Sequence, residues 1–120
     1  MKNKQAFKNL AVWNESLELV KDTYDLSSVF PEDEKDGIVG SLKKQAIKIP
    51  GGISKAMQAD DGDLRKQYFD QSLNAITEIE TLLIIAQKLD FIDPKDVVDF
   101  TEKSNQVSMR VHGLIQKFSN

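Results

Sequence analysis

The side chains that most often carry out catalysis or bind metals are sparse in this sequence. His112 is the only histidine and there is no cysteine, whereas a di-metal site in a helical bundle requires Glu-x-x-His on two helices. Glu78 and Glu80 are two positions apart, so on a helix they diverge by about 200° and cannot act together as acid and base. No Ser/His/Asp motif is present. We therefore expect no enzyme, no metal site and no cofactor.

Lysines are the other side chains here with a chemical use, because their ammonium groups bind phosphate. Lys44, Lys48 and Lys55 fall within about 40° of one another on the predicted helix that carries them, opposite its apolar residues. One more lysine flanks this face, and two further cations open the next predicted helix. The candidate nucleic-acid-binding residues are therefore Lys43, Lys44, Lys48, Lys55, Arg65 and Lys66.

The overall charge favours a more ordinary alternative, in which these lysines form a solvated face. The chain has 19 acidic and 16 basic residues and a formal charge of −3, whereas dedicated nucleic-acid binders are usually basic. Asp60, Asp61 and Asp63 follow closely enough in the sequence to balance the lysines. No aromatic residues alternate with the lysines, so base-specific recognition of RNA is not expected.

The lysines belong to a helix that we predict for residues 37–57. Apolar residues recur there at steps of three and four, which is typical of the a and d positions of a helix in a bundle. The pattern keeps its phase across Pro50, Gly51 and Gly52, a triplet that would otherwise indicate a turn. We therefore expect one long helix, kinked where Pro50 removes a backbone bond, with glycines that let another helix approach closely. The apolar positions are Val39, Leu42, Ala46, Ile49, Ile53 and Ala56.

A helix before this one is predicted from Asn9, a possible N-cap, to the break at Phe30-Pro31. Its core-facing stripe is predicted to be Leu10, Trp13, Leu17, Val20 and Tyr24. A second apolar row lies well round the cylinder from this stripe and consists of Val12, Leu19 and Leu26. A helix with two apolar stripes is buried on two sides.

Two further helices are predicted after residue 60. The first covers residues 63–89, with Asp61 or Asp63 as its N-cap, and the second begins with Asp93 as N-cap and Pro94 in its first turn. The core stripe of the first is Phe69, Ser72, Ile76, Ile79, Leu83 and Ala86, and that of the second is Phe100, Ser104, Val107, Val111, Leu114 and Phe118.

These elements predict an all-α fold, an antiparallel up-down-up-down four-helix bundle in a single domain of residues 1–120. The longest fully apolar run, residues 82–86, is too short to cross a bilayer, and the N-terminus lacks the apolar stretch of a signal peptide. We therefore expect a cytoplasmic protein without a membrane partner.

The apolar residues outside the core stripes predict that the bundle associates with copies of itself. A four-helix bundle requires about one stripe per helix, and additional apolar rows left in water would mark an interface. The predicted interface residues are Val12, Leu19, Leu26, Leu73 and Ile84. Leu19 is central in its row, so Leu19→Glu is expected to dissociate the oligomer without harming the subunit core.

Several short motifs, in order along nearly the whole chain, resemble the 23S rRNA intervening-sequence protein family, a group of four-helix bundles. The first two matches are Phe7-Lys8-Asn9-Leu10-x-Val12-Trp13 to the family's F-x-x-L-x-V-W, and Phe30-Pro31-x-x-Glu34 followed by Gly37-Ile38 to its F-P-x-x-E and G-L. In the next segment, Leu42-Lys43-Lys44-Gln45-Ala46 matches L-R-R-A-A, and Ile49-Pro50 matches the I-P of S-I-P-x-N-I-A-E-G. Further on, Glu78-Ile79-Glu80 matches E-L-E. The chain departs from that signature at residues 52–56, which read Gly-Ile-Ser-Lys-Ala in place of Asn-Ile-Ala-Glu-Gly. A function that depends on the family's Asn and Glu is therefore not implied here.

The resemblance implies a bundle that assembles into a ring-like homopentamer, and no enzymatic activity is established for the group. Members are sometimes encoded within insertions of ribosomal RNA genes. The accessory protein of diversity-generating retroelements resembles this architecture, which suggests RNA or a nucleic-acid-processing protein as a further partner. We expect a non-enzymatic assembly or adaptor protein, and the alternative is an RNA-associated protein that contacts phosphates through its lysine face.

Overall fold

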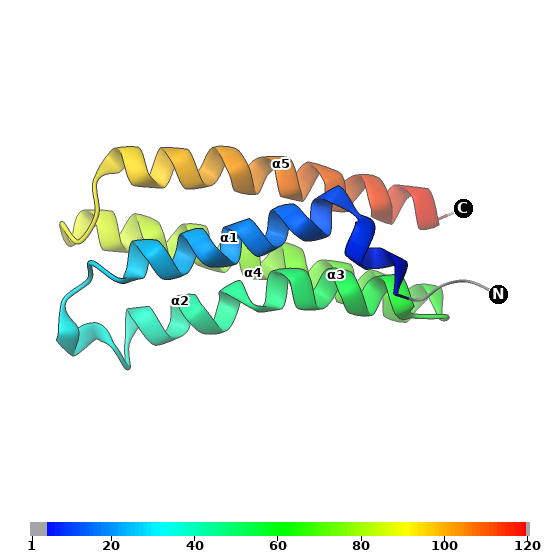
Figure 1. Ribbon diagram of the computed structural model, residues 1–120, viewed down its shortest axis with the longest axis horizontal. Helices are drawn as coiled ribbons and strands as arrows, with labels where there is room; N and C mark the ends of the chain where they lie inside the picture. The colour runs from blue at the N-terminus through cyan, green and yellow to red at the C-terminus, as the bar shows by residue number, and fades with distance from the viewer. Residues whose placement is uncertain (1–4, 120) are drawn as a thin grey trace.

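Helices make up almost all of residues 5–119, the part of the chain that the computed structural model describes (Figure 1). In chain order they are η1 Ala6–Asn9, α1 Ala11–Ser27, η2 Glu32–Glu34, α2 Ile38–Ala46, α3 Lys48–Gln58, α4 Gly62–Lys88 and α5 Pro94–Phe118. The α-helices lie side by side along a molecule of 50 × 24 × 23 Å, with α2 and α3 end to end (Figure 1). No strand occurs in the described range, so the predicted all-α class is confirmed.

The apolar pattern predicted for residues 37–57 is the most completely buried part of the bundle. All six of its predicted apolar positions lie in the core, and residues 50–52 are helical, as expected. The predicted helix is divided at one residue, Ile47, which keeps helical backbone angles of φ −67° and ψ −19° between α2 and α3. Pro50 is the third residue of α3, within the first turn, where a missing N–H costs no intrahelical bond.

Helices α4 and α5 follow their predicted patterns closely. Asp61 is the N-cap of α4 and accepts a hydrogen bond from the Leu64 amide at 2.8 Å. Asp93 caps α5 in a capping box with Asp96, ahead of Pro94. Their predicted core stripes are buried, apart from the last two positions of α5, which are half-buried and packed against the core.

Gly52 allows α3 and α4 to approach closely, which confirms the role expected for the glycines. A Cβ atom on Gly52 would stand 2.5 Å from the Tyr68 carbonyl oxygen and would overlap the Ser72 Oγ atom. The Ser72 hydroxyl donates to the Ile49 carbonyl oxygen at 2.8 Å across this contact. By contrast, a Cβ on Gly51 would meet nothing within 4 Å, so only one glycine of the pair is required for packing.

The most deeply buried face of α1 differs from the predicted one. Val12 and Leu19 are 5% and 1% exposed and belong to the subunit core, whereas Leu17 and Tyr24 are 40% and 42% exposed. Trp13 is half-buried and packs edge-on against Phe7. Leu10, Trp13 and Val20 of the predicted stripe are half-buried and pack against the core, so the stripe is confirmed in part, whereas the predicted burial of Leu17 and Tyr24 is wrong.

Hydroxyl side chains on the buried face of α1 explain why the prediction for this helix failed in part. Three buried residues on the core face of α1 are polar, so they add nothing to an apolar pattern in the sequence. Each donates to a carbonyl of the preceding turn: Ser16 to Trp13 at 2.6 Å, Thr23 to Leu19 at 2.8 Å and Ser27 to Tyr24 at 3.0 Å. These bonds satisfy the hydroxyls, so their burial leaves no unpaired polar group. The helix begins after Leu10, and the predicted N-cap Asn9 instead ends η1.

Candidate nucleic-acid interface

Helices α2 and α3 have an unusual charge distribution, since residues 38–58 contain four lysines and no acidic residue. Among the described residues, none of these lysines forms an ion pair, and the ion pairs present lie on the other helices. The alternative in which nearby aspartates balance the lysines is therefore not supported by direct contacts. We call Lys43, Lys44, Lys48 and Lys55 the lysine face.

The lysines differ in their surroundings. Lys44 is exposed, and Lys48 is half-buried beside α4. The Lys43 ammonium lies 4.9 Å from the centre of the Tyr24 ring, and that of Lys55 lies 5.8 Å from the centre of the Tyr68 ring. No aromatic residue alternates with the lysines in the sequence, as expected, but α1 and α4 place two tyrosine rings beside the lysine face.

Arg65 and Lys66, which were grouped with the lysines, are engaged within α4 and its surroundings. Arg65 donates to the Ala59 carbonyl oxygen at 2.6 Å, and its guanidinium group lies 4.7 Å from the centre of the Phe118 ring. Lys66 pairs with Asp70 at 3.0 Å. The lysine face thus consists of the residues on α2 and α3 alone.

A polar groove of about 400 Å³ runs between the lysine face and α4. Its lining consists of Gln45, Lys48, Gln67, Asp70, Gln71, Asn74 and Ala75. Asp70 is neutralised by its ion pair with Lys66, which leaves Lys48 as the unpaired charge in the groove. Sequence reasoning missed the four amides because two separate segments contribute them.

The sequence comparisons identify the family. A model of the 23S rRNA-intervening sequence protein family matches residues 8–113, from η1 into the last turns of α5. The chain belongs to the 23S rRNA-intervening sequence protein family. This confirms the family expected from the short motifs. A search of curated proteins found no significant match.

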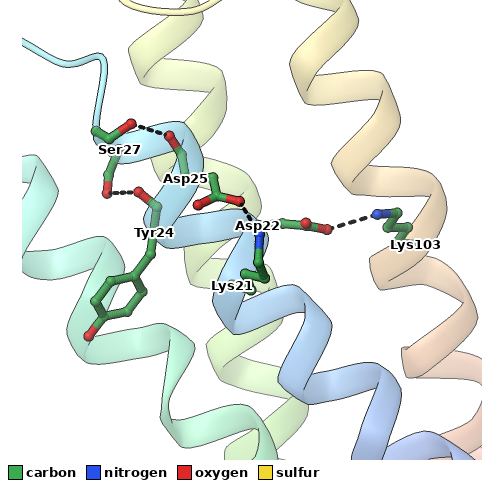
Figure 2. Close-up of polar contacts among 7 residues, drawn as sticks. Lys21, Asp22, Tyr24, Asp25, Ser27 and Lys103 are labelled. Carbon is green, nitrogen blue, oxygen red and sulfur yellow. Dashed lines mark hydrogen bonds and ion pairs between the residues drawn. The ribbon is translucent and has the colours of Figure 1, made fainter.

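The lysine face of this 23S rRNA-intervening sequence protein contrasts with an acidic region where α1 meets α5. Figure 2 shows Tyr24 pointing from α1 toward α2, whereas Asp22 points toward Lys103 of α5, 3.0 Å away. The hydrogen bond that the Lys103 ammonium donates to the Asp22 carboxylate raises the pKa of Lys103 above its usual range. The favourable contribution of this pair is therefore complete below pH 10.5 and is lost as the pH rises through the raised pKa.

A hollow of about 220 Å³ lies beside this pair, lined by Asp22, Asp25, Leu26, Asp96, Asp99, Phe100 and Lys103. Within residues 5–119, no group of three or more His, Asp or Glu side chains is arranged to hold a metal ion. Glu78 and His112 are exposed, and Glu80 accepts a hydrogen bond from the Ser104 hydroxyl at 2.7 Å.

The predicted oligomer interface requires a correction. Val12 and Leu19 are buried inside the subunit, so a neighbouring subunit has almost none of their surface left to cover. Leu26 and Leu73 are half-buried against the core, and Ile84 is 45% exposed.

No helix in the described range is both long and apolar enough to span a bilayer.

Proposed function

We propose that this 23S rRNA-intervening sequence protein is a non-enzymatic, homo-oligomeric assembly or adaptor protein of the cytoplasm. The observation that carries the proposal is an apolar flank on α1, where Leu17 and Tyr24 are 40% and 42% exposed. Ile47, between α2 and α3, is 56% exposed and follows Lys43, whose ammonium lies over the Tyr24 ring, by four residues. Exposed apolar surface that gathers on one flank favours contact with another protein. The ring of five subunits is taken from the family resemblance.

Light scattering coupled to size-exclusion chromatography tests the assembly. We expect a wild-type mass near five times the 13.5 kDa of one chain. Leu17→Glu is expected to reduce the mass to that of one chain, because a buried unpaired carboxylate is costly at an interface. Leu64→Glu, at a position of similar exposure in the first turn of α4, is the matched control and should retain the assembly.

A wild-type monomer at tens of micromolar protein would contradict the assembly proposal. An oligomer that survives Leu17→Glu at full mass would leave the assembly in place but would exclude the α1 flank as its interface.

RNA association through the lysine face is the second candidate function. It is favoured by the four lysines of residues 38–58, which have no acidic neighbour within those helices and no ion pair among the described residues. Clustered cations bind a phosphate backbone largely by releasing condensed counterions. Such binding weakens steeply as salt rises, which separates it from apolar association.

Lys44, Lys48 and Lys55 together provide the test of this second function. Changing all three to alanine is expected to remove most of the salt-sensitive affinity for RNA while leaving the helical content unchanged. Fluorescence anisotropy between about 50 and 200 mM salt measures the affinity, and circular dichroism measures the helices. Wild-type protein that retains no RNA even at the lower salt would contradict RNA association.

For the architecture, we propose that α1, the end-to-end pair α2–α3, α4 and α5 alternate in direction, and that Pro50 causes the division between α2 and α3. Proline has no N–H to donate to the Ala46 carbonyl, and the division lies at the next residue, Ile47. Pro50→Ala is expected to join α2 and α3 while changing the free energy of unfolding by less than about 1 kcal/mol, because first-turn proline costs little. Circular dichroism and a crystal structure of the variant would test this, and a persisting break at Ile47 would contradict it.

A further inference from the structure

The groove between α2–α3 and α4 is lined by several side chains that can form hydrogen bonds but have no partner in the part of the protein that the structure describes. Gln67, Gln71 and Asn74 are spaced by four and three residues, so they form one row along α4. Gln45 and Lys48 line the opposite wall. Within the described residues, none of these four amide side chains has a hydrogen-bond partner in the protein. Each amide offers two donors and one carbonyl acceptor, so the groove is rich in both kinds of group.

Building on the RNA association proposed above, we infer that this groove binds unpaired bases of single-stranded RNA while the lysine face holds the phosphates. Glutamine and asparagine side chains match the paired donor and acceptor atoms on base edges, as in their two-bond contacts with adenine. Lys48 belongs to both surfaces, since it lines the groove and lies on the lysine face. The backbone and the bases of one strand can therefore be bound side by side.

The charge in the groove fits this ligand. A nucleobase is polar but uncharged, and the one carboxylate in the lining, Asp70, already pairs with Lys66 at 3.0 Å. A ligand in the groove therefore meets neutral amides, with unpaired lysines beside them to meet its phosphates. An acidic peptide would also meet the lysines, and its backbone N–H groups would suit the amide acceptors, so an acidic polymer serves as the competitor in the experiment below.

The geometry also favours a single strand over a duplex. In an A-form duplex the major-groove base edges are too deep for side chains to reach, and the wide minor groove is recognised mostly by its shape and 2′-hydroxyls, whereas unpaired bases can be turned outward. The groove is shallow and open to solvent, so bases that have been turned out of the stack can reach its amides from the side.

Removal of the amides without a change of charge tests the inference. Gln71→Met combined with Asn74→Leu keeps the side chains similar in size but eliminates both amides. Anisotropy titrations would use short adenylate, uridylate and cytidylate homopolymers. We expect the wild type to prefer one homopolymer, and the variant to lose about tenfold in affinity for it together with the preference, because a good bidentate base contact carries discrimination of this order.

The dependence on salt separates the groove from the lysine face. The amide variant should retain the wild-type slope of log affinity against log salt, whereas Lys44, Lys48 and Lys55 changed to alanine should reduce the slope by about 2. Asn105→Leu with Gln106→Met, at exposed positions of α5, is the matched control and should change neither quantity. Thermal unfolding would verify the fold of each variant, and Gln67→Met provides a second, milder removal of an amide.

The outcomes distinguish this inference from RNA association itself. If RNA binds through the lysines but the amide variants keep both affinity and preference, the groove is excluded while RNA association stands. If the wild type binds no RNA at low salt, both are overturned. The inference would also be overturned if the protein bound an RNA duplex more tightly than a single strand of equal length. The same holds if polyglutamate displaced the single strand as well as unlabelled single-stranded RNA does, because neither ligand presents unpaired bases.

Discussion

Gly52→Ala is expected to lower the free energy of unfolding by about 1–3 kcal/mol, the usual range for overpacking a core. The new Cβ would lie 2.5 Å from the Tyr68 carbonyl oxygen, which is backbone and moves only if α3 and α4 separate. It would also displace the Ser72 hydroxyl, which donates to the Ile49 carbonyl oxygen at 2.8 Å. The loss of that buried hydrogen bond adds to the cost.

Gly51→Ala is the matched control, because it makes the same chemical change one residue earlier in α3. A Cβ there meets nothing within 4 Å, so the variant should gain about 0.5–1 kcal/mol from the lower entropy of alanine in the unfolded chain. Urea unfolding followed by circular dichroism measures both changes. Two variants of equal stability would contradict the close contact between α3 and α4.

The packing of α2, α3, α4 and α5 could be predicted because their core positions are mostly apolar. Single serines within those patterns, Ser72 and Ser104, were placed correctly because the apolar residues on either side indicated the face. In α1 the same inference fails. Three of its core positions carry hydroxyls, so the flank with Leu17 and Tyr24 has the stronger apolar pattern although it is partly exposed.

The candidate site was predictable to the extent that it lies on one continuous segment. Lys44, Lys48 and Lys55 were proposed from helical spacing, because all three lie in one segment whose break at Ile47 is a single residue with helical backbone angles. The amides of the groove, the rings beside Lys43 and Lys55, and the internal contacts of Arg65 depend on how neighbouring helices are rotated against one another. That rotation is set by packing details such as the contact at Gly52, which local periodicity does not contain.

Leu19→Ala is expected to lower the free energy of unfolding by about 2–5 kcal/mol, the range for removing a buried leucine side chain. Leu19 is 1% exposed in a single subunit, so the loss comes from a cavity inside the bundle and not from an interface. The loss should therefore be the same at low and high protein concentration. Leu19→Glu is expected to unfold the subunit, which replaces the expectation that it would only dissociate an oligomer.

Leu17→Ala provides the comparison, since Leu17 is two residues away on the same helix and 40% exposed. In the isolated subunit its cost should remain below about 1 kcal/mol, as for most surface positions. In an assembly that covers the α1 flank, Leu17→Ala would lower the melting temperature in a way that depends on protein concentration, because association stabilises the folded state by mass action. Thermal unfolding of both variants over a hundredfold range of concentration would separate core from interface. If Leu17→Ala and Leu19→Ala lowered the melting temperature equally, and both losses depended on protein concentration, this assignment of the two faces of α1 would be contradicted.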